Sequence, residues 1–288
     1  VKASRGLGDV YKRQDIVSMS AGEPDFDTPQ NIKNSAIDAI KRGETKYTAV
    51  DGIDELKQSV IDKFEKENNL YFEKKNISVA PGGKSIIYNA IFSTINPGDE
   101  VIIPAPFWVS YPDIVKLAGG NPVIIKTSSE NNFKISANQL EKSITDKTKW
   151  LFINSPSNPT GQVYSKSELT EIIKVLKKYK NVYILSDDIY EYIRYKNHDK
   201  FYTIAELDDE IFSRTITMNG VSKAYSMTGW RIGYCGGPVE IINAMRKLMG
   251  QSTSNPSSIS QWASVEALNG SRDFLQNWIP SFREISCL

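Results

Sequence analysis

Short apolar runs alternate with helical patterns between residues 77 and 236, and this alternation is the feature that most constrains the fold. Several runs are apolar without alternating polarity, which is typical of strands covered on both faces. We therefore predict an α/β layer fold with a mostly parallel central sheet flanked by helices. The predicted strands are ISVA (77–80), EVIIP (100–104), PVIIK (122–126), KWLFI (149–153), VYILS (182–186), RTITM (214–218) and RIGYC (231–235).

Helical patterns precede the first predicted strand and follow the last one in the sequence. Thr28 is predicted to cap a first helix that has Pro29 in its first turn and ends at Gly43, and a second amphipathic helix follows at 53–64. From Val239 onward the pattern is helical apart from a break at 252–258. Because the strand alternation is lost there, we expect a second, smaller domain to begin near the end of the chain.

Charge and cysteine content narrow the class of protein. The 35 basic and 34 acidic residues are interspersed, and no basic stripe suggests a nucleic-acid partner. No apolar run has the length of a membrane span, so no membrane partner is expected, and no metal site is expected either. Two cysteines, Cys235 and Cys287, do not make a disulfide framework, and their number fits the reducing cytoplasm that we predict.

Polar clusters follow four of the predicted strands, at the edge where parallel sheets bind ligands. The first is PGGKS (81–85), where Gly82 and Gly83 would let backbone N–H groups approach an anion at a helix N-terminus. The match to a nucleotide-binding P-loop fails because Ser78 stands where that motif needs its first glycine. A plain tight turn is the alternative for this stretch.

The second and third clusters offer an amide, a carboxylate and a phenol. Asn158, held extended before a proline in NSPSNPTG (154–161), could donate to a ring oxygen or form an Asx turn. Asp187, at a strand end, would be costly to bury unless it met a cation or a protonated ring nitrogen. We expect Asp188 to be a solvated acid at a helix start, and Tyr190 to lie on the same side as Asp187.

The fourth cluster is SKAYSMTGWRIGY (222–234). A lysine becomes a nucleophile when burial or a neighbouring cation lowers its pKa, and Lys223 has Arg231 nearby in the sequence. Taken alone, Lys223 could be a structural lysine in a turn. Together the four clusters supply partners for pyridoxal phosphate: an amine for its aldehyde, a carboxylate for its ring nitrogen, and donors for its hydroxyl and phosphate.

Seven motifs, in order, resemble the class I aminotransferases of the pyridoxal-phosphate fold type I, and are most similar to bacterial aspartate aminotransferases, some of which accept prephenate. The resemblance covers about residues 15–283. It implies a homodimer that takes an amino acid and a 2-oxo acid as substrates. The motifs are AGEPDFDTP (21–29), KYTAVDGIDELK (46–57), PGGK (81–84), PFWVSYP (106–112), NSPSNPTG (154–161), SDDIYE (186–191) and SKAYSMTGWRIGY (222–234).

The resemblance also implies a role for each matching residue. Lys223 would form the Schiff base and shuttle the proton, and Asp187 would pair with the pyridinium nitrogen. Tyr47 would reach the phosphate of the partner subunit. Tyr190 and Asn158 would hold the ring oxygen, Trp108 would stack on the ring, and Gly22, Trp108 and Asn158 would contact the substrate. Gly82, Gly83, Lys84, Ser222 and Arg231 would surround the phosphate, although Lys84 could instead contact an acidic side chain of the substrate.

The sequence departs from the family pattern in places. Asp188 stands where the family usually has Glu, and no residue here matches the C-terminal arginine that binds the substrate α-carboxylate. We expect a non-native leader at 1–14, a small-domain segment at 15–30, a large cofactor-binding domain at 31–270 and only the start of a truncated small domain at 271–288. The leader could instead be a flexible native terminus. We therefore expect the cofactor site to be mostly retained and transamination to be poor.

Other functions on the same fold remain open. A β-lyase or a decarboxylase would use the same cofactor, and a non-catalytic sensor would use the same domain without turnover. No helix-turn-helix pattern precedes residue 15, which disfavours a transcriptional sensor. His198, the one histidine, lies in a polar loop and is expected to be solvated.

Overall fold

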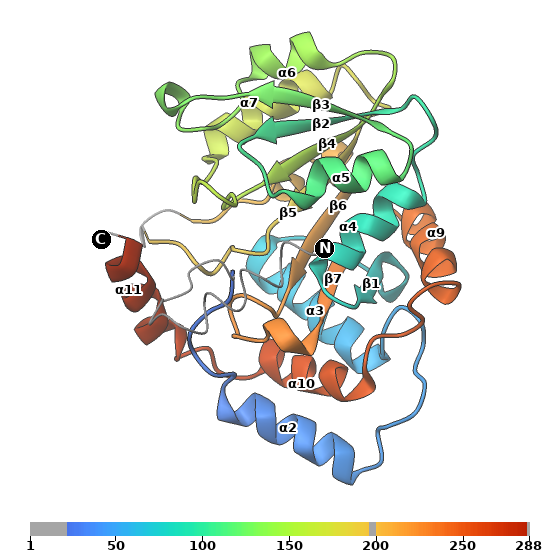
Figure 1. Ribbon diagram of the computed structural model, residues 1–288, viewed down its shortest axis with the longest axis vertical. Coiled ribbons are helices and arrows are strands. Elements are labelled where there is room, and N and C mark those ends of the chain that lie inside the picture. Colours follow the sequence, from blue (N-terminus) through green and yellow to red (C-terminus); the bar gives the residue numbers. More distant parts are fainter. Residues whose placement is uncertain (1–21, 196–199, 287–288) are drawn as a thin grey trace, which may run out of the picture.

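The computed structural model describes residues 22–195 and 200–286. The predicted leader at 1–14, His198 and Cys287 lie outside the described residues, as does the first part of the segment at 15–30. The described chain forms one seven-stranded sheet with helices on both faces (Figure 1). The strands are β1 (Ile77–Ala80), β2 (Glu100–Ala105), β3 (Asn121–Lys126), β4 (Thr148–Asn154), β5 (Tyr183–Asp187), β6 (Thr215–Gly220) and β7 (Gly233–Gly236).

The strand order is β1-β7-β6-β5-β4-β2-β3, and the pairs from β6 to β3 are parallel. The β7 strand pairs antiparallel with both β6 and β1. Since two reversals restore the direction, β1 runs the same way as the parallel strands. The predicted α/β fold with a mostly parallel sheet is therefore confirmed, with β7 as its antiparallel member.

Helices connect most of the strands, and further helices precede β1 and follow β7 in the sequence. Short 3₁₀ turns fill several of the remaining connections. The helices are α2 (Gln30–Lys41), α3 (Asp54–Asn68), α4 (Gly83–Phe92), α5 (Ser110–Leu117), α6 (Ala137–Ser143), α7 (Lys166–Leu176), α8 (Asp209–Phe212), α9 (Val239–Gly250), α10 (Ser258–Asn269) and α11 (Leu275–Ser286). The 3₁₀ turns are η1 (Lys74–Asn76), η2 (Ser129–Asn131), η3 (Ile204–Leu207) and η4 (Thr228–Trp230).

Successive residues of each central strand enter different hydrophobic cores, as the pleat requires. In β4, Trp150 and Phe152 pack on the face covered by α4, α5 and α9, whereas Leu151 and Ile153 pack beneath α6 and α7 (Figure 1). A third core lies between α2, α3, α10 and the β1–β7 end of the sheet. This double coverage explains why the strands read as continuous apolar runs.

Many predicted element boundaries differ from the observed ones by one to four residues, as for the second helix, which is predicted at 53–64 and observed at Asp54–Asn68. Helix α2 begins at Gln30 with Pro29 at its N-cap, because the Thr28 hydroxyl donates to the carbonyl of Ser226 and does not cap the helix. The sequence pattern after the second strand predicts a helix that begins near Phe107, but α5 begins at Ser110. The last strand begins at Gly233 because Arg231 has a left-handed backbone with φ of 55°, which interrupts a strand.

The segment that precedes α2 packs against α11. Phe26 stacks on Trp278 with ring centroids 4.7 Å apart, and it meets Phe282 edge-on at 5.4 Å. The assignment of residues 15–30 and 271–288 to a second domain stays a prediction. None of the helices within the described ranges combines the length and apolar character needed to span a bilayer.

Candidate active site

A cavity of about 420 Å³ lies at the carboxyl edge of the sheet. Asn154 ends β4 and Asp187 ends β5, so the parallel strands deliver both side chains to the same edge. Most of the predicted site residues line this cavity. They are Gly22, Gly83, Lys84, Trp108, Asn158, Asp187, Tyr190, Ser222, Lys223 and Arg231.

Lys223 projects into this cavity from the loop after β6. Its ammonium donates a hydrogen bond to the carbonyl of Gly22 and lies 5.9 Å from the centre of the Tyr190 ring. Burial lowers the pKa of Lys223, Glu23 raises it and the Arg231 charge lowers it, with a net shift downward. The lysine is therefore easier to deprotonate than a surface lysine, as a nucleophilic amine requires.

Asp187 is buried at the floor of the cavity. Its carboxylate accepts a hydrogen bond of 2.5 Å from the Tyr111 hydroxyl and one of 3.3 Å from the Ile189 N–H. Burial raises the pKa of Asp187 to about 6, and these two hydrogen bonds oppose that rise. Neither donor carries a charge, so the carboxylate still favours a cationic ligand group.

Tyr190 adds a phenol on the same side of the cavity. Burial and the Asp187 charge raise the pKa of Tyr190 to about 12, while a hydrogen bond with Asn158 lowers it. The phenol is therefore protonated at neutral pH and can donate to a ligand oxygen. Asn154 holds the neighbouring loop, because its amide donates to the Asp187 carbonyl at 2.8 Å and accepts the Asn158 N–H at 2.7 Å.

The glycine loop before α4 makes room for Arg231. Gly82 has φ of 90°, and a Cβ there would lie 2.2 Å from the Arg231 Nη2 atom. The guanidinium is fixed from its other side, where Nη1 donates to the Thr228 carbonyl at 2.8 Å. The N-terminus of α4 at Gly83 faces the same cavity, so a planar cation and free N–H groups converge there as an anion would require.

An aromatic wall and a second lysine complete the cavity. The Lys84 ammonium lies 4.9 Å from the centre of the Trp108 ring, and Trp108 packs edge-on against Tyr111 at 5.6 Å. A flat ring in the cavity would therefore have an indole available for stacking.

Comparisons with known proteins agree with this geometry. The family model described as "Aminotransferase class I and II" matches residues 14–284. The chain belongs to the class I and II aminotransferases. It is 58% identical over 262 residues to a probable aspartate/prephenate aminotransferase of Rickettsia conorii, covering 91% of this chain and 65% of that protein. It is 55% identical to the aspartate/prephenate aminotransferase of Cereibacter sphaeroides, again covering 91% and 65%.

Solved aminotransferase structures share the fold. The aspartate aminotransferase of Rhizobium meliloti superposes with a TM-score of 0.94 at 49% identity, covering 98% of this chain and 70% of that one. The Thermus thermophilus aspartate aminotransferase with maleate gives a TM-score of 0.92 at 39% identity, covering 98% and 73%. The chain spans about two thirds of the length of the curated relatives that it matches.

Two predicted site residues lie outside this aminotransferase cavity. Gly82 borders it through Arg231 and is not part of its lining. Tyr47 is 92% exposed on the loop between α2 and α3. The expectation for Asp188 is wrong. Its side chain is buried, accepts from the Ser186 hydroxyl at 2.7 Å and belongs to no helix, because the chain turns back after β5.

Sequence reasoning missed several residues of the cavity. Tyr111 and Asn154 both lie inside recognised motifs, and their positions at a helix start and a strand end were the available signals. Glu23 and Thr228 come from distant segments, and the Thr228 hydroxyl donates to the Glu23 carboxylate at 2.5 Å. That contact depends on tertiary structure and has no local sequence signal.

Proposed function

We propose that this protein is a pyridoxal-phosphate-dependent aminotransferase that transfers an amino group from aspartate to 2-oxoglutarate. The observation that carries the proposal is the cavity where Lys223, Asp187, Tyr190 and Arg231 meet. The names of the relatives support aspartate as donor, and they favour prephenate as an alternative acceptor. The donor, the acceptors and the activity of the full-length protein are all part of this proposal.

The residues present fit pyridoxal phosphate. Asp187 is a buried carboxylate whose hydrogen-bond donors are both neutral, so a protonated ring nitrogen would supply the missing positive charge. The pocket beside Gly82 leaves the Arg231 guanidinium and the start of α4 for a phosphate. Trp108 would cover the ring, and Tyr190 with Asn158 would donate to its hydroxyl.

When bound, the cofactor would supply an aldehyde that condenses with amines and a ring that withdraws electrons. Lys223 would provide the amine, and its Nζ atom would accept a proton from the substrate and return it. The lowered pKa of Lys223 supports this role, because a base must be unprotonated in part at working pH. Asp187 would keep the ring nitrogen protonated.

We also propose that the active unit is a homodimer. Tyr47 is almost wholly exposed and does not line the cavity of its own chain. A large aromatic side chain in that position is suited to contact with a second copy. The family resemblance supports the same proposal, because it implies that Tyr47 reaches the phosphate of the partner subunit.

Covalent labelling tests the proposal without requiring turnover. The protein is loaded with pyridoxal phosphate, reduced with borohydride and digested for peptide mapping. We expect a pyridoxyl adduct on Lys223 and none on the exposed Lys66 of α3. Absence of the Lys223 adduct would overturn the proposal.

A second assay separates the reaction from its rivals on the same cofactor. Aspartate is added to the loaded protein, and the release of 2-oxo acid, ammonia and carbon dioxide is measured. An aminotransferase half-reaction releases the 2-oxo acid and retains the nitrogen, whereas a β-lyase releases ammonia and a decarboxylase releases carbon dioxide.

A further inference from the structure

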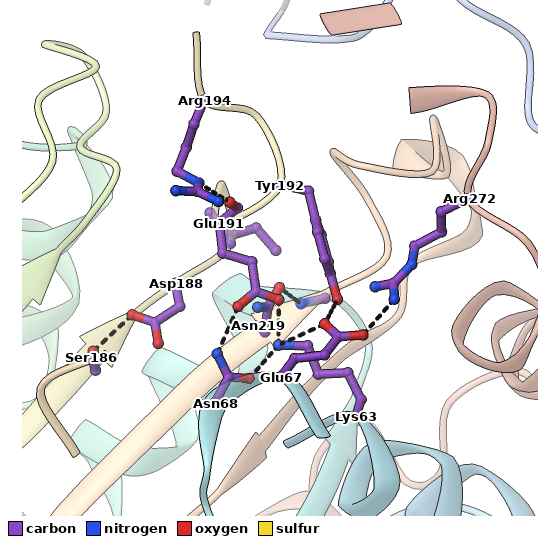
Figure 2. A network of polar contacts seen from close by, with 12 residues as sticks. Lys63, Glu67, Asn68, Ser186, Asp188, Glu191, Tyr192, Arg194, Asn219 and Arg272 are labelled. Atoms are coloured by element: carbon purple, nitrogen blue, oxygen red, sulfur yellow. Dashed lines mark hydrogen bonds and ion pairs between the residues drawn. The ribbon is translucent and has the colours of Figure 1, made fainter. Parts of the chain in front are cut away.

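An ionic cluster with a buried centre and a partly exposed edge lies behind the candidate active site, on the side of the turn after β5 that faces away from the cavity. It consists of Lys63, Glu67 and Asn68 of α3, Glu191 and Tyr192 of the turn, and Arg272 before α11 (Figure 2). Buried charges are expensive unless paired, and such a cluster must hold its members in defined positions.

Glu191 is the centre of this cluster. Its side chain is 4% exposed and forms an ion pair with the Lys63 ammonium, whose side chain is 2% exposed. The other carboxylate oxygen of Glu191 accepts from the Asn68 amide at 3.0 Å, and Lys63 donates to the Asn68 oxygen at 2.6 Å (Figure 2). Three side chains are thus mutually bonded with water excluded.

The turn that carries Glu191 has two faces. Asp187 and Tyr190 face the cavity, whereas Asp188 and Glu191 are buried away from it. The turn is closed by the Glu191 N–H, which donates to the Asp188 carbonyl at 3.0 Å. A displacement of Glu191 must therefore move Tyr190, its neighbour, and strain the backbone that presents Asp187.

The cluster also contacts the loop after β6, which carries Lys223. The Tyr192 hydroxyl donates to Glu67, and its ring meets the Tyr225 ring edge-on with centroids 6.2 Å apart. Tyr225 is buried two residues after Lys223. Arg272 pairs with Glu67 at 2.5 Å, so the two basic and two acidic groups of the cluster balance in charge.

We propose that the Lys63–Glu191 ion pair is a positioning device that sets Asp187 and Tyr190 for binding of the cofactor ring. This inference rests on the proposed function, because it assigns these residues to the same pyridoxal phosphate site. Lys63 and Glu191 touch neither cofactor nor substrate in this assignment and act through the turn.

The test compares Lys63→Met, Glu191→Gln and the double variant that carries both changes. Lys63→Met leaves the buried Glu191 carboxylate without its ion-pair partner, and Glu191→Gln leaves Lys63 with only the more distant Glu67 carboxylate at 3.9 Å. Each single variant should therefore unfold at a lower midpoint than the wild type. The double variant removes both charges, so its unfolding midpoint should return toward that of the wild type. Lys66→Met on the exposed face of the same helix is the matched control.

Two measurements follow cofactor binding: the Kd for pyridoxal phosphate, and the visible circular dichroism per mole of bound cofactor at saturation. We expect all three cluster variants to weaken the Kd by about tenfold or more and to change the dichroism, which reports ring orientation. In the double variant, the Kd and the dichroism should still differ from the wild-type values even though its stability recovers. The control should match the wild type.

The double variant decides the outcome even if a single variant does not fold. Wild-type Kd and dichroism in a stable double variant would overturn the inference while leaving the proposed function intact. If the wild type itself binds no pyridoxal phosphate at Lys223, the proposed function falls, and the inference falls with it.

Discussion

The Tyr111 hydroxyl donates a hydrogen bond of 2.5 Å to the Asp187 carboxylate, and both side chains are buried. Tyr111 comes from the first turn of α5, and Asp187 comes from the end of β5. The contact therefore joins two motifs that lie far apart in the sequence. It fixes the direction of the carboxylate and stabilises its charged form against burial.

Tyr111→Phe should weaken pyridoxal phosphate binding. A hydrogen bond to a charged group contributes about 1.5–3 kcal/mol, so the Kd should rise roughly ten- to hundredfold. The pKa of Asp187, about 6 in the intact site, should rise further because this hydrogen bond lowers it. The pH midpoint for binding should shift upward, as titration of the Kd would show. Tyr71→Phe on an exposed loop is the control. Equal pH midpoints in the wild type and both variants would contradict the assignment of Asp187 to the ring nitrogen.

Much of the fold could be predicted because the strands bury both faces and therefore read as distinct apolar runs. The candidate site was predictable where a residue ends a strand or follows one within a recognisable motif, as Asp187 and Lys223 do. Tyr47 is a different case, since nothing in one chain shows what an exposed tyrosine contacts.

Asp188 shows where local reasoning fails. An acid after a strand is usually solvated, but here the chain turns back and α3 covers the turn with Lys63. Burial beneath a distant helix is a property of tertiary packing. The same limit applies to Glu23, whose contact with Thr228 spans 205 residues.

Gly82→Ala should separate backbone strain from damage to the anion pocket. The added Cβ would collide with Arg231 at 2.2 Å, and the backbone has φ of 90°. Gly98→Ala is the matched control, because Gly98 has φ of 94° with nothing within 4 Å. Both variants should lose about 1 kcal/mol of unfolding free energy in the absence of cofactor. Only Gly82→Ala should also bind inorganic phosphate and pyridoxal phosphate more weakly, by about tenfold or more; equal affinities in the two variants would count against the pocket.

The pKa of Lys223 should respond in opposite directions to its two charged neighbours. Glu23 raises it and Arg231 lowers it, while burial is the largest cause of the overall decrease. Glu23→Gln should therefore move the pH midpoint for modification of Lys223 downward, and Arg231→Met should move it upward. The rate of labelling by an amine-reactive reagent, followed at the Lys223 peptide, measures both midpoints. Lys66 in the same digest supplies the reference, and a common direction of shift would refute the electrostatic account.

Asp188→Asn should remove a pH dependence of stability from the cofactor-free protein. Burial raises the pKa of Asp188 from 3.8 to about 8, with Ser186 and Thr203 opposing the rise, Glu191 adding to it and Lys63 opposing it. Because the folded pKa lies above the unfolded one, the folded state binds the proton more tightly. The stabilisation is present below about pH 4 and is lost as the pH rises through about 8.

In this window Asp188 should contribute a fall of about 1.4 kcal/mol in unfolding free energy per pH unit. Asn cannot ionise, so urea unfolding of the variant should lack this slope. Asp187 and Glu206 also have raised pKa values, but they are present in both proteins and cancel in the difference. Loss of the hydrogen bond from Ser186 would shift the unfolding free energy of the variant by the same amount at every pH, and so would not change its slope. Parallel curves from about pH 5 to pH 8 would show that Asp188 does not titrate there.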